Sequence, residues 1–296
     1  MRSAEAARPA RVVSVGRNAA WIAFEESDDL FHASIVKHRE RLSLVPGDLV
    51  RAIALDAERM LIERCEPRSF VLERKTAGGR TKTMAANVDG IAIVTAFVDP
   101  PFHAAMVDEL LAFAEIHELR PRLLLTKADL TDPATADEIV GRYRRLGYPV
   151  FSINPRARIG LDEIERELRD HRTLLIGQSG VGKSSLFRAF GGSSTVGEVS
   201  AIGRGRQTTT TGRLHHLPGG FLIDSPGVGE FELHGFGWAE VADGFIEFRP
   251  LIGKCRFTDC THRTEPACAI RSAVEAGEIE RARYGSYLAI IEREKL

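Results

Sequence analysis

The segment with the clearest chemical meaning in this chain is rich in glycine and ends in a lysine and two serines. Residues 177–184 read GQSGVGKS, which fits the G-x-x-x-x-G-K-S template of a phosphate-binding loop in full. In that template backbone N–H groups wrap phosphate oxygens, the lysine reaches the β- and γ-phosphates, and the serine ligates Mg²⁺. The sequence therefore predicts that Lys183 also supports catalysis. The nucleotide phosphates are expected to bind at Gly177, Gln178, Ser179, Gly180, Val181, Gly182, Lys183, Ser184 and Ser185.

A second motif, Thr126-Lys127-Ala128-Asp129, is of the kind that reads guanine. The Asp129 carboxylate can accept hydrogen bonds from N1–H and the exocyclic amine of guanine, whereas adenine presents an acceptor at N1. A site built this way rejects the base that leaves its carboxylate unmatched. Thr126 and Lys127 belong to the same predicted site, with Lys127 along the base plane, and Ser152 is expected near the base carbonyl. Small GTPases ordinarily carry the phosphate loop first, so the two motifs here occur in inverted order.

Two further segments offer ligands for Mg²⁺ and a sensor for the γ-phosphate. In Asp224-Ser225-Pro226-Gly227, which follows an apolar run, the aspartate can hold Mg²⁺ through water and the Gly227 N–H can contact the γ-phosphate. Residues 203–211, GRGRQTTTT, lie between this motif and the phosphate loop, and one of three threonines there is expected to ligate the metal. The predicted magnesium residues are Ser184, Thr208, Thr209, Thr210 and Asp224.

Three cysteines and one histidine form a cluster near the C-terminus, with the spacing Cys255-x4-Cys260-x-His262-x5-Cys268. Three thiolates and an imidazole make a closed tetrahedral set for one structural Zn²⁺, because no position remains for water. The alternative is a group of reduced structural cysteines beside a surface histidine. The fourth cysteine, Cys65, is expected to be a small buried apolar residue.

These motifs need a scaffold, and the hydrophobic pattern of residues 88–234 predicts one. Strand-like apolar runs alternate with helical periodicity, which indicates a mostly parallel sheet that is covered on both faces. Ligands of such sheets bind at the carboxyl ends of strands. The expected strands are residues 91–97, 122–126, 150–153, 173–177 and 221–224, and the expected helices are 103–119, 134–146 and 161–170. On this prediction Thr126, Ser152, Gly177 and Asp224 all lie at strand ends.

The flanking segments differ from the central one. Short strand-like runs and turns in residues 11–65 predict a small barrel of the OB type, which either binds nucleic acid or only packs on its neighbour. Residues 66–83 are expected to be a linker that either clamps phosphates or is a solvated loop, and Arg74, Lys75, Arg80 and Lys82 lie around its two central glycines. After Gly227 the alternation stops, and residues 238–296 combine the cysteine cluster with helical patterns at 269–276 and 278–294.

Composition limits the possible partners and location. The chain has 296 residues, 44% of them hydrophobic, and a formal net charge of −1, so nucleic-acid binding requires local basic patches. We find no apolar run of about 18 residues and no secretory signal pattern, so we expect a cytoplasmic protein without a membrane partner.

In the combination of these motifs the chain resembles the RsgA/YjeQ family of circularly permuted GTPases, from about residue 11 to 292. Further matches are Ala85–Asp89, Pro100–Phe102 and Glu265–Ile270. The resemblance implies a flexible N-terminus (1–10), an OB-fold (11–70), a linker (71–87), a permuted P-loop GTPase domain (88–234) and a small helical zinc-binding domain (235–296). It also implies a monomer that binds GTP or GDP with Mg²⁺ and one structural Zn²⁺. Its GTP hydrolysis would be stimulated by the small ribosomal subunit during late maturation, with rRNA contacts through the OB and zinc domains.

The chain departs from the family pattern at two positions. Thr126 stands where the family usually has Asn, so we expect weaker nucleotide binding. Gln207 stands where the family has His, and Val228 stands where many GTPases have Gln. An amide can orient a water molecule but cannot accept its proton at neutral pH. We therefore expect Gln207 to orient the attacking water and intrinsic turnover to be slow.

Two other functions are compatible with parts of the sequence. One is an RNA-binding module whose nucleotide site gates affinity with negligible hydrolysis. The other is a P-loop ATPase or small-molecule kinase, against which Asp129 argues. A further hypothesis concerns connectivity: residues 228–233 lead from the γ-phosphate motif to the zinc unit, which would couple nucleotide state to that unit.

Overall fold

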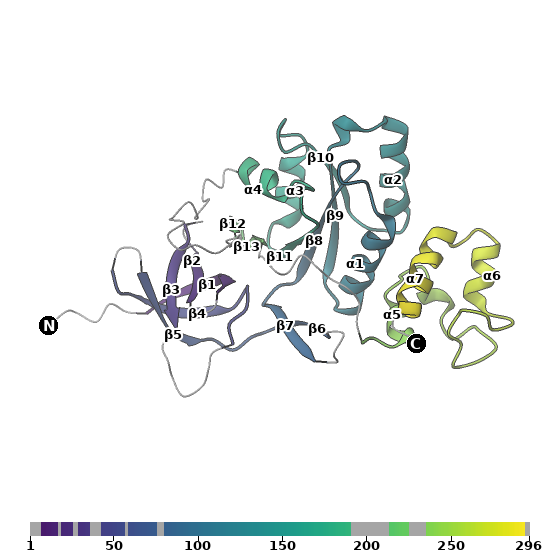
Figure 1. The fold of residues 1–296 in the computed structure, drawn as a ribbon, viewed down its shortest axis with the longest axis horizontal. Helices are drawn as coiled ribbons and strands as arrows, with labels where there is room; N and C mark the ends of the chain where they lie inside the picture. The colour runs from purple at the N-terminus through teal and green to yellow at the C-terminus, as the bar shows by residue number, and fades with distance from the viewer. Residues whose placement is uncertain are drawn as a thin grey trace, which may run out of the picture.

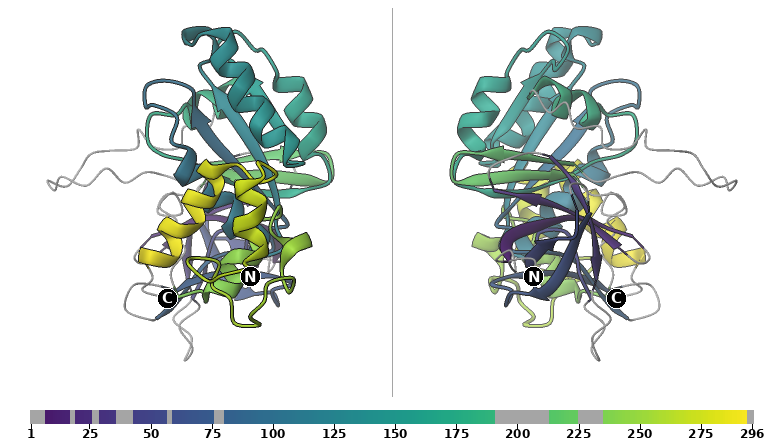
Figure 2. Two further views of the ribbon diagram at one scale, coloured as in Figure 1. Left: turned by 90° about the vertical axis from the view of Figure 1, so that its right-hand side faces the viewer. Right: turned by 90° about the vertical axis from the view of Figure 1, so that its left-hand side faces the viewer.

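The computed structural model describes residues 7–16, 19–25, 29–35, 43–56, 59–75, 80–190, 213–224 and 235–293. Three parts follow one another along the chain, namely a barrel, a sheet flanked by helices, and a helical C-terminal unit (Figure 1). The barrel and the C-terminal unit lie at opposite ends of the long axis, so each faces the viewer in one view of Figure 2.

The N-terminal part is a closed five-stranded barrel, which confirms the predicted barrel. Its strands follow the order β1-β2-β3-β5-β4, and only the β3–β5 pair is parallel. The core consists of inward-facing aliphatic residues such as Val12, Ile22 and Ile62, all fully buried. The strands are β1 (Arg8–Val15), β2 (Ala19–Phe24), β3 (Phe31–Ile35), β4 (Leu49–Ala54) and β5 (Arg59–Cys65).

Strand β1 joins the barrel to the central part because both of its faces are buried. Val12 belongs to the barrel core, whereas its neighbour Val13 packs into the core of the central part. The residue before them, Arg11, places its guanidinium 4.3 Å from the Phe221 ring centroid and donates to the Gly47 carbonyl over 3.0 Å. Burial lowers the pKa of Arg11, so this cation depends on the ring and the carbonyl for stabilisation.

The segment expected as a linker, residues 71–87, instead contains a β-hairpin. Strands β6 (Val71–Lys75) and β7 (Thr81–Ala86) pair antiparallel as a separate two-stranded sheet. It is ordered by burial, since Leu72, Met84 and Ala85 pack into the same core as the central sheet. Residues 71–75 and 81–86 are therefore strands rather than an irregular solvated loop, and Arg80 and Lys82 are exposed.

The central part is a six-stranded sheet in the order β10-β9-β8-β11-β13-β12, parallel except for the β12–β13 pair. Every residue of β8 is buried, with Ile91 and Ile93 on one face and Ala92 and Val94 on the other. This pattern is typical of an interior strand covered on both sides. The strands are β8 (Gly90–Ala96), β9 (Arg120–Thr126), β10 (Val150–Ile153), β11 (Arg172–Ile176), β12 (Arg213–Leu217) and β13 (Gly220–Asp224).

Two helices cover each face of this sheet. Helices α1 (Ala104–Ile116) and α2 (Pro133–Arg145) pack on the face of Ile91. Helices α3 (Leu161–Leu168) and α4 (Lys183–Ala189) pack on the face of Ala92. The predicted α/β architecture is confirmed.

The C-terminal unit is helical and packs against α1. It contains α5 (Trp238–Asp243), a short 3₁₀ turn (Arg249–Leu251), α6 (Ala269–Glu275) and α7 (Arg281–Arg293). Helices α5 and α7 lie beside α1 (Figure 1) and share its apolar core, which includes Phe245 and Tyr287. Among the described residues, no helix has both the length and the apolar character needed to span a membrane.

Candidate functional site: a nucleotide site and a metal centre

The predicted phosphate loop joins β11 to α4, and its backbone tolerates only glycine at the first position. A Cβ on Gly177 would lie 2.2 Å from the carbonyl oxygen of Val94, and the φ of Gly177 is +153°. Gly182, with φ of +105°, begins α4 at a point where Thr126 is the nearest neighbour. The two glycines therefore allow the loop to turn tightly against β8 and β9.

The lysine of this loop lies over the loop itself. The Lys183 ammonium donates to the carbonyls of Gly177 and Gln178, the latter over 2.9 Å. Burial lowers its pKa. The negative charge of Asp224, at the end of the neighbouring strand β13, raises the pKa by a smaller amount. Lys183 and Asp224 thus influence one another electrostatically, as a phosphate and metal site requires. Side chains of the loop that are open to solvent are Gln178, Ser179 and Ser184.

The first residue of the base-reading motif ties that motif to the phosphate loop. Thr126 is 1% exposed, and its Oγ1 lies 2.6 Å from the carbonyl oxygen of Val181 and 3.2 Å from that of Thr95. A hydroxyl has a single proton, so the shorter contact identifies Val181 as its acceptor. Thr126 therefore keeps a link to the phosphate loop despite lacking an amide.

The remaining base-reading residues lie at the same edge of the sheet. Lys127 adopts a left-handed backbone conformation, and its ammonium donates to the carbonyl of Asp99. Asp129, on a short 3₁₀ turn, and Ser152, near the end of β10, are exposed and available to a ligand. Because β9 and β10 are paired in register from Leu123 and Val150 onward, their loops open side by side.

One participant at this edge was missed by sequence reasoning. Strand β8 lies between β9 and β11, so the loop that follows it, residues 97–102, begins at the same edge of the sheet as the base reader and the phosphate loop. The Asp99 carbonyl accepts a hydrogen bond from the Lys127 ammonium. Pro100 lies beside Gly180, where a Cβ would come 3.8 Å from Pro100 Cδ. In the sequence, Pro100–Phe102 is distinguished only by the family resemblance. Its role depends on β8 being central, which the order of residues along the chain does not reveal.

Five of the predicted site residues lie outside the described part of the chain, and so does Val228. They are Gln207, Thr208, Thr209, Thr210 and Gly227.

The cysteine cluster is brought together as predicted. The Sγ atoms of Cys255 and Cys268 are 3.9 Å apart, and Nδ1 of His262 is 3.5 Å from each of them. All four candidate ligand atoms, including that of Cys260, lie within 4.8 Å of one another. A tetrahedral zinc with Zn–S bonds of about 2.3 Å would separate its sulfurs by about 3.8 Å. The donor set and its spacing therefore fit Zn²⁺.

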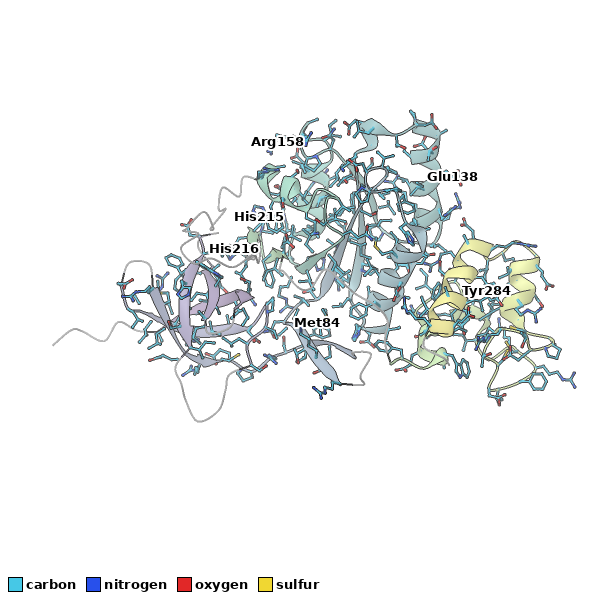
Figure 3. The ribbon with its side chains drawn as sticks, in the orientation of Figure 1. Met84, Glu138, Arg158, His215, His216 and Tyr284 are labelled. Atoms are coloured by element: carbon cyan, nitrogen blue, oxygen red, sulfur yellow. The ribbon has the colours of Figure 1, made fainter. Side chains whose placement is uncertain are left out.

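Hydrogen bonds around the cluster hold its ligands in place. The backbone N–H groups of Ala269 and Arg271 donate to the Sγ atoms of Cys255 and Cys268 over 3.3 and 3.5 Å. Such second-layer bonds orient metal ligands and stabilise thiolates. Helix α7 adds two more, because Tyr284 Oη (Figure 3) donates to the His262 carbonyl over 2.7 Å and Tyr287 Oη donates to that of Thr261 over 2.8 Å.

A half-buried carboxylate organises the loop between the ligands. Glu265 accepts from the N–H and hydroxyl of Thr261 at 2.8 and 2.5 Å, and from the N–H groups of Arg263 and Thr264 at 2.9 and 3.0 Å. Burial alone would raise its pKa, but these hydrogen bonds to the charged form lower it to about 2. The loop is therefore closed around an ionised carboxylate.

Comparisons with known proteins agree with this geometry. The profile of the RsgA GTPase family matches residues 65–234. A protein of Chromohalobacter salexigens named small ribosomal subunit biogenesis GTPase RsgA is 43% identical over 273 residues, covering 88% of this chain and 80% of that protein. A protein of the same name from Gemmatimonas aurantiaca is 39% identical over 293 residues, covering 94% and 95%.

Solved structures give the same answer for the whole fold. YjeQ from Thermotoga maritima superposes with a TM-score of 0.70 at 27% identity, covering 97% of this chain and 98% of that one. YloQ, described as a circularly permuted GTPase, superposes with a TM-score of 0.71 at 26% identity, covering 100% and 97%. The inverted order of the two motifs is thus shared with a solved permuted GTPase. Motifs, fold and relatives agree that the chain belongs to the RsgA GTPase family.

Proposed function

We propose that this chain binds the small ribosomal subunit and hydrolyses GTP during the late maturation of that subunit. The observation that carries the nucleotide part is the hydrogen bond from Thr126 to Val181, which joins the guanine motif to the phosphate loop at one edge of the sheet. The ribosomal part is supported by the name that the relatives share, small ribosomal subunit biogenesis GTPase.

In this proposal each motif has a defined task. The amide groups of residues 177–185 and the Lys183 ammonium hold the phosphates, and the exposed carboxylate of Asp129 reads the guanine edge. Ser152 contacts the base carbonyl. Together these contacts orient the γ-phosphate for attack by water, which is the main contribution that a GTPase makes to its reaction.

The residues present also fit Mg²⁺. The Ser184 hydroxyl is exposed beside the loop, and the Asp224 carboxylate ends the strand next to β11. Both offer oxygen, the donor that Mg²⁺ prefers, and we assign one of Thr208, Thr209 and Thr210 to the same set. When bound, the ion neutralises charge that develops on the phosphates. Gly227 would contact the γ-phosphate, and Gln207 would orient the water.

The flanking parts are proposed to contact rRNA. We assign this role to the barrel (11–70) and the zinc unit (235–296), with the nucleotide domain (88–234) between them and the hairpin region (71–87) as their connector. One Zn²⁺ would be structural because its four protein ligands leave no open position. The proposed role assigns the chain to the cytoplasm as a monomer that exchanges GTP and GDP.

The decisive experiment measures phosphate release from GTP, with and without purified small subunits. We expect slow intrinsic release, a clear acceleration by subunits, and no inhibition by excess ATP. The control is Lys183→Ala, which should abolish both rates. An RNA-binding module that is merely gated by nucleotide would show GTP-dependent co-sedimentation with subunits without phosphate release, and this result would refute the proposal.

A further inference from the structure

A cluster of buried charges joins the C-terminal unit to the nucleotide domain. Asp108 on α1 and Arg283 on α7 are each 1% exposed, and Arg283 Nη1 donates to Asp108 Oδ1 over 2.8 Å. Arg283 also donates to both carboxylate oxygens of Glu247, over 2.7 and 3.1 Å. Asp108 further accepts from Tyr143 Oη at 3.0 Å and Ser286 Oγ at 2.6 Å. We call these five residues the joint cluster.

The joint cluster is satisfied only when α7 is docked on α1. Without Arg283, the carboxylate of Asp108 would be buried beside hydroxyl groups alone, and a buried charge that loses its partner is strongly destabilising. Docking and charge pairing therefore occur together.

Helix α7 connects this joint to the metal cluster within one turn. Arg283 and Ser286 contact Asp108, whereas Tyr284 and Tyr287 donate to the carbonyls of His262 and Thr261. Helix α7 therefore contacts both the joint cluster and the loop that carries the metal ligands.

On its other side the joint cluster contacts the loop that follows β8. The Tyr143 ring lies 6.2 Å from the Phe102 ring at an interplanar angle of 68°, an edge-to-face contact. Phe102 ends the 97–102 loop. Its backbone N–H donates to the carbonyl of Phe97 over 3.3 Å, and this hydrogen bond closes the loop. The Asp99 carbonyl of that loop accepts from the Lys127 ammonium, and Pro100 lies beside Gly180 of the phosphate loop, where a Cβ would come 3.8 Å from Pro100 Cδ.

We infer that Arg283 is a positioning residue for nucleotide binding, acting through Asp108 and Tyr143 on the 97–102 loop. This inference rests on the proposed guanine-nucleotide site. By linkage, a bound nucleotide in turn stabilises the docking of α7. This coupling passes through Asp108 on α1. It therefore differs from the connection through residues 228–233 that the sequence suggested.

The test uses the full-length chain and GDP as the probe. Arg283→Lys and Tyr143→Phe should weaken GDP binding by roughly two- to thirtyfold, with Arg283→Lys the stronger of the two. The matched control is Tyr148→Phe, because Tyr148 is also a buried tyrosine, yet its hydroxyl has no hydrogen-bond partner among the described residues. Its GDP affinity should stay within twofold of the parent.

A second readout separates positioning from general damage. Hydrogen exchange of the α7 amides in the parent should slow by about fivefold or more when GDP is saturating. This protection should decrease in Tyr143→Phe and persist in Tyr148→Phe. If Arg283→Lys does not fold, the parent and the two tyrosine variants still decide the question.

The outcomes distinguish this inference from the proposed function. A parent that binds GDP, but shows no protection of α7 and the same affinity in all variants, overturns the inference and leaves the proposed function intact. A parent that binds no guanine nucleotide overturns the proposed function itself. Reduced affinity in Tyr143→Phe together with lost α7 protection supports the inference.

Discussion

The hydroxyl of Thr126 donates to the carbonyl of Val181 over 2.6 Å, so a residue of the base-reading motif holds the phosphate loop in place. Two motifs that are far apart in sequence thereby share one buried hydrogen bond. Nucleotide affinity should be sensitive to this bond, because it orders the loop before the ligand arrives.

Replacing Thr126 with valine removes the donor while preserving shape. We expect GTP and GDP to bind about 2- to 10-fold more weakly, since a typical intramolecular hydrogen bond contributes about 0.5–1.5 kcal/mol. Thr173→Val is the matched control, because Thr173 is equally buried and its hydroxyl has no partner among the described residues. Equal affinity of Thr126→Val and the control in a nucleotide titration would contradict this role. Thr126→Asn should bind more tightly than the parent if the family's amide adds a further contact.

Substituting Asp129 with asparagine should change the base that is recognised. The amide donates where the carboxylate accepted, so guanine loses its match and xanthine, with a carbonyl in place of the exocyclic amine, gains one. We expect GTP binding to fall by at least about 100-fold and xanthosine triphosphate binding to rise. A competition titration with both nucleotides measures the exchange. Unchanged preference for GTP would show that Asp129 does not face the base.

Removal of a metal ligand should release zinc. Cys260→Ser is expected to purify with less than one zinc per chain and to lose the structure of residues 255–268, whereas Cys65→Ser should retain zinc. Cys65 is a suitable control because it is half-buried and remote from the cluster, and burial raises its pKa to about 11. Metal analysis and near-UV circular dichroism report the two effects. Equal zinc content in the two variants would exclude a zinc centre at this cluster.

Stability should decrease as the pH falls below 6.5 because of His117. Its ring packs against Phe113 and Phe236, and burial lowers its pKa below the ordinary 6.5. The negative charge of Glu73 raises this pKa, but by less than burial lowers it. The unfolded chain therefore binds a proton that the folded chain excludes, so the stabilising contribution is complete above pH 6.5 and is lost below it. His117→Phe should lose less stability than the parent between pH 7.5 and 5.5 in urea unfolding. Identical losses would exclude His117 as the cause.

Replacing Gln207 with alanine tests how the attacking water is oriented. If its amide holds that water, subunit-stimulated turnover should fall by about 10-fold or more while GTP affinity is unchanged. Phosphate release under saturating subunits measures the rate. Equal stimulated rates in Gln207→Ala and the parent would assign water positioning to another group.

Features encoded in short stretches of sequence could be predicted, and features that depend on distant partners could not. The metal ligands occur within fourteen positions, and the phosphate loop has its strand and helix directly beside it, so local spacing was sufficient. The strands β6 and β7 were not predicted, because the basic residues in this segment indicate a polar linker. The buried positions Leu72 and Met84 are too few to form a clear alternating pattern in the sequence.

The importance of α1 was missed for a related reason. Asp108 reads as a polar residue on an exposed helix face, yet it is buried because α7 covers it. The two residues are 175 positions apart, and no local pattern pairs them. Likewise, the role of the 97–102 loop depends on β8 lying between β9 and β11, a property of sheet order rather than of sequence order.

The separation of Asp108 from Arg283 also sets the order of events during synthesis. The ribosome adds about 5–20 residues per second, so the 175 residues from Glu109 to Arg283 take roughly 9–35 s to make. During that interval the strands β9 to β13 are made, while the charged partner of Asp108 does not yet exist. Docking of α7 is therefore among the last folding steps, and a chain that ends before Arg283 carries every nucleotide motif without the support behind them. By the coupling inferred above, such a chain should bind GDP more weakly than the full-length protein.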